Sequence, residues 1–125
     1  MDKRDLFEIV TGNTYWVDSG SKSATQNGSS QHPFRTIQGA MNKCTASNGD
    51  FIYAKPGHAE TITAELKFDV AGVTIKGLGK GNLRPTLTPN LALDCIIVSA
   101  ANMRLENFIF AAPDVDGQNS DIRIT

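Results

Sequence analysis

Two stretches of the chain, FDVAGVTIKGL (Phe68–Leu78) and VSAANMRLENF (Val98–Phe108), carry the same pattern of apolar residues thirty positions apart. Within each stretch apolar and polar residues alternate, which is the period of a β-strand and not of a helix. The apolar positions that we expect to form a repeated core are Phe68, Val70, Val73, Ile75, Val98, Met103, Leu105 and Phe108. Self-similarity at a period of about 20 to 50 residues is typical of a solenoid, whose units bury their apolar faces by stacking. The repeat therefore predicts stacked β-coils.

The composition limits the classes of protein to which the chain can belong. It has 125 residues, which is enough for one domain, and a formal net charge of −1 with scattered Lys and Arg. This charge pattern predicts neither a nucleic-acid partner nor an anionic membrane partner. No apolar run approaches the roughly 18 residues of a membrane span, and the charged start of the chain is unlike a signal peptide. We expect a protein that is made and assembled in a cytoplasm.

The segments before the repeat suggest a contact arm, a loop and a cap. Residues 1–13 form a leader whose apolar residues, expected to contact a partner, are Leu6, Phe7, Ile9 and Val10. A β-helix domain is expected over residues 14–125, beginning with a strand at Thr14–Val17. Residues 18–32 are rich in Ser, Gly, Asn and Gln and predict an exposed polar loop. Residues 33–45 carry one apolar stripe at helical spacing, which predicts a helix that caps the first coil.

Further strands are expected between turn-forming residues along the rest of the chain. Their expected ranges are Phe51–Ala54, Glu60–Thr63, Leu66–Val70, Val73–Lys76, Thr86–Thr88, Cys95–Ser99, Met103–Phe110 and Asp121–Thr125. Asn102 and Asn107 lie at bends and are expected in the left-handed conformation that asparagine tolerates. No capping segment follows the last strand, which indicates either a fragment or a coil covered by another subunit. We therefore expect Ile122 and Ile124 to contact a partner.

Four stretches together carry a resemblance to a known group of proteins. They are PFRTIQGAMNKC (33–44), NGDFIYAKPGHAETIT (48–63), DVAGVTIKGLGKGNLRPTLT (69–88) and ANMRLENFIF (101–110). The chain resembles the N-terminal portion of right-handed parallel β-helix (pectin-lyase-like) proteins, and more specifically it is similar to a group of such proteins encoded by tailed bacteriophages and prophages. The resemblance covers about residues 14–125. It implies an all-β fold, a short right-handed parallel β-helix of about three to four coils with an N-terminal capping α-helix.

No convincing set of catalytic residues is found in the sequence. Asp69 and Arg104 could approach each other across adjacent coils, but a surface ion pair is the ordinary explanation. His58 follows a Pro-Gly turn without a partner at recognisable spacing, which favours a surface or hydrogen-bonding role. Tyr15 and Trp16 could stack on sugars, although packing beside the capping helix explains them more simply. We expect a protein that is not an enzyme.

Two further groups of residues are of the types found in metal or redox sites. Asp114, Asp116 and Asp121 provide alternating oxygen ligands around a glycine and are the candidate ligands for a calcium ion. They lack the complete loop pattern, and a solvated corner rich in Asp and Asn is the simpler interpretation, so no cofactor is expected. Cys44 and Cys95 lie among apolar neighbours and are expected to be buried thiols, neither a disulfide nor a metal pair.

The resemblance and the apolar ends of the chain together suggest a function. We expect a non-enzymatic bacteriophage virion protein, most concretely a head decoration or cement protein. It would bind the capsid protein on the exterior of the shell, as a trimer, after assembly in the bacterial host cytoplasm. The alternative is a tailspike or tail-fibre segment that binds host surface polysaccharide or, with further coils, cleaves it. A polysaccharide lyase or hydrolase is the remaining possibility, because the same scaffold carries all of these functions.

Overall fold

The computed structural model describes residues 12–89, 96–110 and 122–124. These residues form short strands with little helix. The strands are β1 (Thr14–Val17), β2 (Phe51–Ala54), β3 (Ala59–Ile62), β4 (Leu66–Phe68), β5 (Thr74–Gly77), β6 (Thr86–Pro89), β7 (Ile96–Val98), β8 (Arg104–Glu106), β9 (Ile109–Phe110) and β10 (Ile122–Ile124). The helices are α1 (Ile37–Met41) and the 3₁₀ turn η2 (Gly81–Leu83). The expected all-β class is confirmed.

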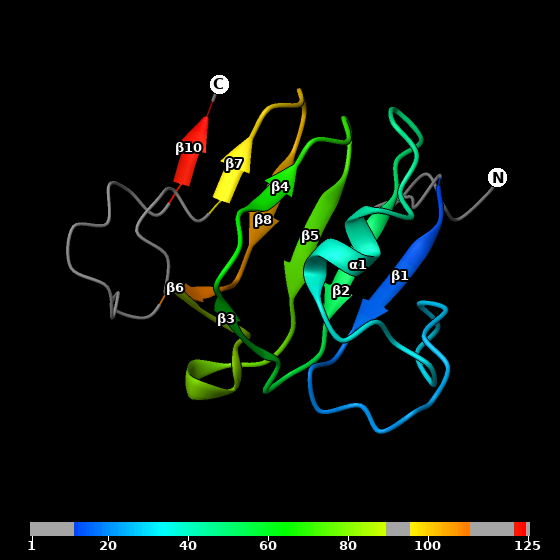
Figure 1. Ribbon diagram of the computed structural model, residues 1–125, viewed down its shortest axis with the longest axis vertical. Coiled ribbons are helices and arrows are strands. Elements are labelled where there is room, and N and C mark those ends of the chain that lie inside the picture. The colour runs from blue at the N-terminus through cyan, green and yellow to red at the C-terminus, as the bar shows by residue number, and fades with distance from the viewer. Residues whose placement is uncertain (1–11, 90–95, 111–121, 125) are drawn as a thin grey trace, which may run out of the picture.

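The strands belong to three parallel sheets (Figure 1). We call them the β1 sheet (order β1-β2-β5-β8), the β3 sheet (β3-β6-β9) and the β4 sheet (β4-β7-β10). From β2 onward the chain enters the three sheets in rotation, so β2, β3 and β4 each lie beside the strand that follows three places later. From β2 onward, consecutive strands therefore belong to different sheets, and each strand pairs with one from the preceding or following round.

Two of the strand pairs have the thirty-residue offset that the sequence repeat predicts. Phe68 lies opposite Val98 in the β4 sheet, and Ile75 lies opposite Leu105 in the β1 sheet. Other neighbours have a different offset: Ile52 and Ile75 are paired although they are 23 positions apart. The apolar residues between the sheets form one core, and its most deeply buried members include Val17, Ile37, Met41, Ile52, Phe68, Val73, Ile75, Leu87 and Ile96.

The helix is shorter than the expected 33–45 and begins after Thr36. Phe34 does not join the helix, because its N–H donates to the carbonyl of Trp16. Phe34 also forms a parallel bridge with Val17, the last residue of β1. Thr36 has an extended backbone, and its hydroxyl accepts a hydrogen bond from the N–H of Gly39 at 3.1 Å, which makes it an N-cap. The five residues of α1 pack against β1, β2 and β4.

Left-handed residues set the corners that precede the strands of the β1 sheet. Gly49 (φ 73°), Gly72 (φ 80°) and Asn102 (φ 59°) each lie two positions before β2, β5 and β8, respectively. The expectation of left-handed asparagines is confirmed, since Asn107 also has a φ of 62°. Asn107 divides the single strand expected at Met103–Phe110 into β8 and β9, which belong to different sheets.

The polar loop 18–32 lies along the edge of β1 that β2 does not cover. The N–H of Trp16 donates to the carbonyl of Gly28, so the loop satisfies part of the open strand edge. The Lys55 ammonium donates to the carbonyl of Ser30 at 2.6 Å, and the Arg35 guanidinium donates to two further loop carbonyls. These contacts hold a mostly exposed segment on the strands.

Several residues for which the sequence predicts a role fall outside the part of the chain that the structure describes. They are Leu6, Phe7, Ile9 and Val10 of the leader and the candidate calcium ligands Asp114, Asp116 and Asp121. Ile122 and Ile124 lie in β10, where they pair with Ile96 and Val98 of β7.

Candidate functional site: a buried histidine bridge

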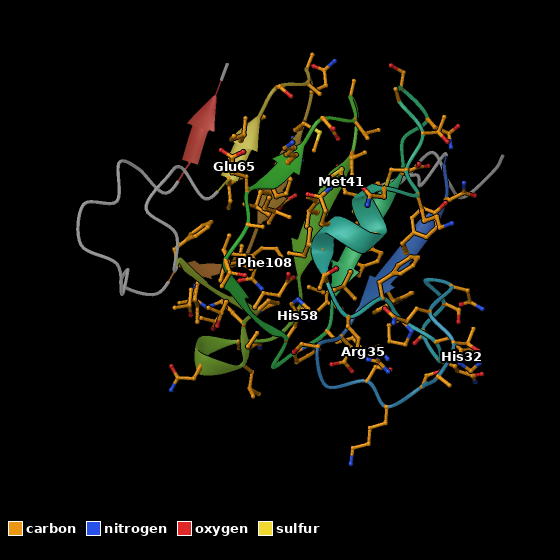
Figure 2. All side chains as sticks on the ribbon, viewed as in Figure 1. His32, Arg35, Met41, His58, Glu65 and Phe108 are labelled. Carbon is orange, nitrogen blue, oxygen red and sulfur yellow. The ribbon has the colours of Figure 1, made fainter. Side chains whose placement is uncertain are left out.

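The structure places one ionisable ring inside the molecule, at the start of β3. His58 is 1% exposed, and with Asp50 it makes up the buried polar residues of the described chain. It follows the turn at Pro56–Gly57, where Gly57 has a φ of 82°. Figure 2 shows His58 inside the molecule, whereas His32 lies at the outer edge, on the polar loop. Burying a polar ring is costly unless both nitrogens are bonded.

Each ring nitrogen of His58 has a hydrogen-bond partner, one on the polar loop and the other on Glu60. Nδ1 accepts a hydrogen bond from the backbone N–H of Ser19 at 2.8 Å, and Nε2 lies 2.6 Å from Oε2 of Glu60. Because a backbone N–H can only donate, Nδ1 carries no proton and Nε2 is the donor to the Glu60 carboxylate. The Oγ of Ser19 in turn accepts from the N–H of Ala59 at 3.0 Å. The polar loop is thus bonded to β3 through two contacts.

Glu60 extends the bridge to the helix. Its Oε2 also accepts a hydrogen bond from the N–H of Ile37, the first residue of α1, at 2.9 Å. That N–H has no partner within the helix, so the carboxylate supplies one. His58 and Glu60 lie two positions apart near the start of β3, on the same face. Three segments, the polar loop, β3 and α1, therefore meet at one imidazole and one carboxylate.

The three residues have the composition of a serine hydrolase triad but not its geometry. In a triad the imidazole must face the serine Oγ, and here it faces the Ser19 N–H while Ser19 Oγ faces the chain of β3. The side chain of His58 is fully buried, so a substrate has no access to it. The arrangement holds segments together and leaves no nucleophile activated.

Asp50 forms a second buried bridge, immediately before β2. One carboxylate oxygen accepts from the N–H of Asn13 and from the Asn48 side chain, each at 2.8 Å, and the other accepts from the N–H of Thr45 at 2.7 Å. Burial and, secondly, the nearby charge of Asp50 raise the pKa of the Cys44 thiol to about 12. The thiol therefore stays protonated at neutral pH and is a poor nucleophile.

A serine and a histidine also meet in the polar loop. The Oγ of Ser23 lies 2.6 Å from Nδ1 of His32, but this hydroxyl also lies 2.9 Å from the carbonyl of Thr25, to which it can donate. Since a hydroxyl has one hydrogen, His32 is then the donor in this pair and cannot act as a base toward Ser23. The contact shapes the loop.

The outward face of the β1 sheet carries an aromatic row. The rings of Trp16 and Tyr53 are 5.2 Å apart between centroids and those of Phe51 and Tyr53 are 5.8 Å apart. The ammonium of Lys55 lies 5.8 Å from the centre of the Trp16 ring. Trp16 and Tyr53 are half-buried and pair in register, and Lys76 continues the row on β5. Aromatic and charged side chains thus lie together on one outer face.

A shallow hollow of about 210 Å³ lies beside the histidine bridge. Its lining residues come from the start of α1 and from the connection between β3 and β4: Thr36, Gln38, Glu60, Thr61, Ile62, Thr63, Ala64, Glu65 and Leu66. Of these residues Ile62 and Leu66 are buried, whereas the three threonines are exposed and the two glutamates are half-buried. Glu60, already bonded to His58, is the residue shared by the hollow and the bridge.

The remaining residues singled out in the sequence lie apart from these features. The ion pair of Arg104 is with Glu106, at 3.8 Å between exposed side chains on β8, and Asp69 follows β4 in a different sheet. Within the described residues no three His, Cys, Asp or Glu side chains are grouped as metal ligands. Among the described residues, no helix has the length and apolar character needed to cross a membrane.

Comparison with protein-family models, curated protein sequences and solved structures finds no match to this chain.

The sequence predicts the role of His58 only in part. A histidine and a glutamate two positions apart in a strand share one face, which could have identified Glu60 as the partner. Ser19 gave no signal, because a loop residue 39 positions away is brought to the imidazole only by the fold.

Proposed function

We propose that the chain forms the first coils of a right-handed parallel β-helix. The rotation of the chain through three parallel sheets supports this proposal. In this arrangement each set of three strands is one coil, and α1 occupies the place of a strand beside β4 in the coil that contains β1. The helix and the polar loop then serve as the N-terminal cap, which hides strand edges that would otherwise recruit other chains.

We propose further that the protein is a non-enzymatic structural component of a bacteriophage virion. The most concrete form is a head decoration protein that binds the capsid exterior as a trimer. The observation that supports a structural role is the set of hydrogen bonds that the buried ionisable groups make. Within the described residues Asp50 and His58 are both fully engaged in bonds that hold backbone segments together. The phage setting rests on the sequence resemblance.

The test is binding to capsid shells. Shells assembled from the coat protein of the phage or prophage that encodes this chain should co-sediment with it and become saturated at a fixed stoichiometry. Light scattering of the free protein should give the mass of a trimer. A monomer that does not bind shells would contradict the decoration role.

The aromatic row favours a second candidate function, which is binding of host surface polysaccharide by a tailspike or tail-fibre segment. Aromatic faces and neighbouring charges are the groups that bind sugars, and Trp16, Tyr53, Lys55 and Lys76 supply them on one sheet face. The chain has a single tryptophan, so its fluorescence reports on this row alone. A saturable change on adding capsular or O-antigen polysaccharide, lost in Tyr53→Ala, would favour this function over capsid decoration.

A further inference from the structure

The contacts of His58 make the attachment of the polar loop depend on the protonation state of one ring. The loop reaches β3 through the Ser19 N–H, which needs a lone pair on Nδ1. On the other side of the ring, Nε2 donates to the Glu60 carboxylate. A proton added to the ring can only go to Nδ1, because Nε2 already carries one.

We propose that His58 is a pH-sensitive latch that holds the first residues of the polar loop on β3 when it is neutral and releases them when it is protonated. Protonation would place two N–H donors face to face where 2.8 Å now separates donor from acceptor. At the same time the bond to the Glu60 carboxylate would become an ion pair and therefore stronger. Protonation would therefore keep the contact with Glu60 and break the contact with Ser19.

Among the charged groups near the His58 ring, Glu60 is the one in direct contact with it. The neighbouring loop residue Asp18 accepts from the N–H of Gly20, and the Lys55 ammonium is directed to Ser30 and Trp16. Strand β6 contributes the Thr86 N–H to the His58 carbonyl, and α1 contributes the Ile37 N–H to Glu60. In the described chain Glu60 alone places a charged atom in hydrogen-bond contact with the imidazole. Histidine as a residue type changes its charge between about pH 5 and 8.

The release is expected to be local. The later part of the loop keeps contacts that do not involve the ring, such as the bond from the Trp16 N–H to the Gly28 carbonyl and the bond from Lys55 to Ser30. Protonation should therefore free Ser19 and its bond to Ala59 while Gly28 stays on β1. The surface that the loop presents to a partner would change without unfolding of the sheets.

The experiment is NMR of the full chain between pH 7.5 and pH 5. The amide proton of Ser19 should move upfield with the same midpoint as the imidazole nitrogens of His58. Its protection from exchange, corrected for the intrinsic pH dependence, should fall roughly three- to tenfold, as expected for one lost hydrogen bond. The amide of Trp16, which donates to the Gly28 carbonyl, should keep its protection. The chain has two histidines, so His32→Gln is the matched control and should leave the transition unchanged.

The latch is contradicted if the Ser19 amide stays in place while His58 titrates, if it follows His32, or if His58 remains neutral at pH 5 in the folded protein. In His58→Gln the pH dependence of the Ser19 amide should be absent. If that variant does not fold, the comparison of the two midpoints in the wild-type chain and in His32→Gln decides the question.

Discussion

Two regions of the molecule are held together by different interactions. In the N-terminal region, residues 12–62, irregular segments meet at the buried groups Asp50 and His58, whose bonds join residues up to 39 positions apart. In the repeat region, residues 66–89 and 96–110, strands are held by ladder hydrogen bonds and by apolar residues in matching register, such as Ile75 beside Leu105. Segments without a paired neighbouring strand therefore need side chains to satisfy their backbone groups.

The strongest way to break the repeat region is to place a charge in its core. Ile75→Asp should prevent soluble folding, because it buries an unpaired carboxylate between the sheets and removes apolar contacts. A loss of at least about 4 kcal/mol is expected, which is a large part of the total stability of a small domain. Soluble expression and circular dichroism measure the effect. Thr74→Asp, on the opposite face beside Arg104, is the control and should fold; normal folding of Ile75→Asp would overturn the register.

A smaller loss is expected when the buried bridge before β2 is removed. Asp50→Ala leaves the N–H groups of Asn13 and Thr45 without their acceptor. The free energy of unfolding in urea should fall by about 3 kcal/mol, since the substitution removes two part-buried hydrogen bonds to a charged group, each of which contributes roughly 1.5 to 3 kcal/mol. Asp69→Ala removes an exposed carboxylate and should change it by less than about 0.5 kcal/mol. Equal losses of unfolding free energy in the two variants would show that the bonds of Asp50 stabilise the protein no more than an exposed carboxylate does.

The corner between β8 and β9 tests a backbone conformation inside the repeat region. Asn107 has a left-handed φ, and its side-chain amide donates to the carbonyls of Gly77 and Gly79. Asn107→Ala should destabilise the protein by about 1 to 2 kcal/mol, because alanine tolerates this φ poorly and makes neither bond. Asn107→Gly restores the conformation and should recover part of that loss. If glycine were no better than alanine, the backbone strain would have to be discarded as a cause.

The smallest effect concerns Cys44 at alkaline pH. With a pKa of about 12 in the folded protein against an ordinary 9.0, the thiol is protonated in the folded state and ionised in the unfolded state between these pH values. Its contribution to stability is therefore full below pH 9 and falls as the pH rises toward 12. In a Cys95→Ala background, Cys44 should react slowly with a disulfide reagent at pH 8 until the protein is unfolded. Rapid reaction of the folded chain would contradict the raised pKa.

The sequence predicted the repeat region better than the N-terminal region, and the reason is physical. Alternating apolar residues such as Val73 and Ile75 specify both a strand and a buried face. The offset of Phe68 from Val98 then gives the pairing of strands. By contrast, the helix was predicted eight residues too long, because its apolar stripe could not show that Phe34 bonds to β1.

The candidate site was predicted least well. Its three residues, Ser19, His58 and Glu60, come from a loop and a strand that only the fold brings together. Asp50 appeared in the sequence as part of a turn, and nothing in the turn signal distinguishes a buried carboxylate from an exposed one. Local patterns predict local structure, whereas bonds between irregular segments depend on tertiary position.

The unequal offsets between paired strands have a consequence for protein engineering. Ile52 and Ile75 are paired at an offset of 23, and Ile75 and Leu105 at an offset of 30, so the register tolerates connections of different lengths. At the η2 corner, the space around the Cβ position of Gly81 is empty and Leu83 is 60% exposed. A foreign peptide inserted after Gly81 would leave the pairing of β5 with β8 intact. This corner is therefore a natural position for displaying an epitope on the scaffold.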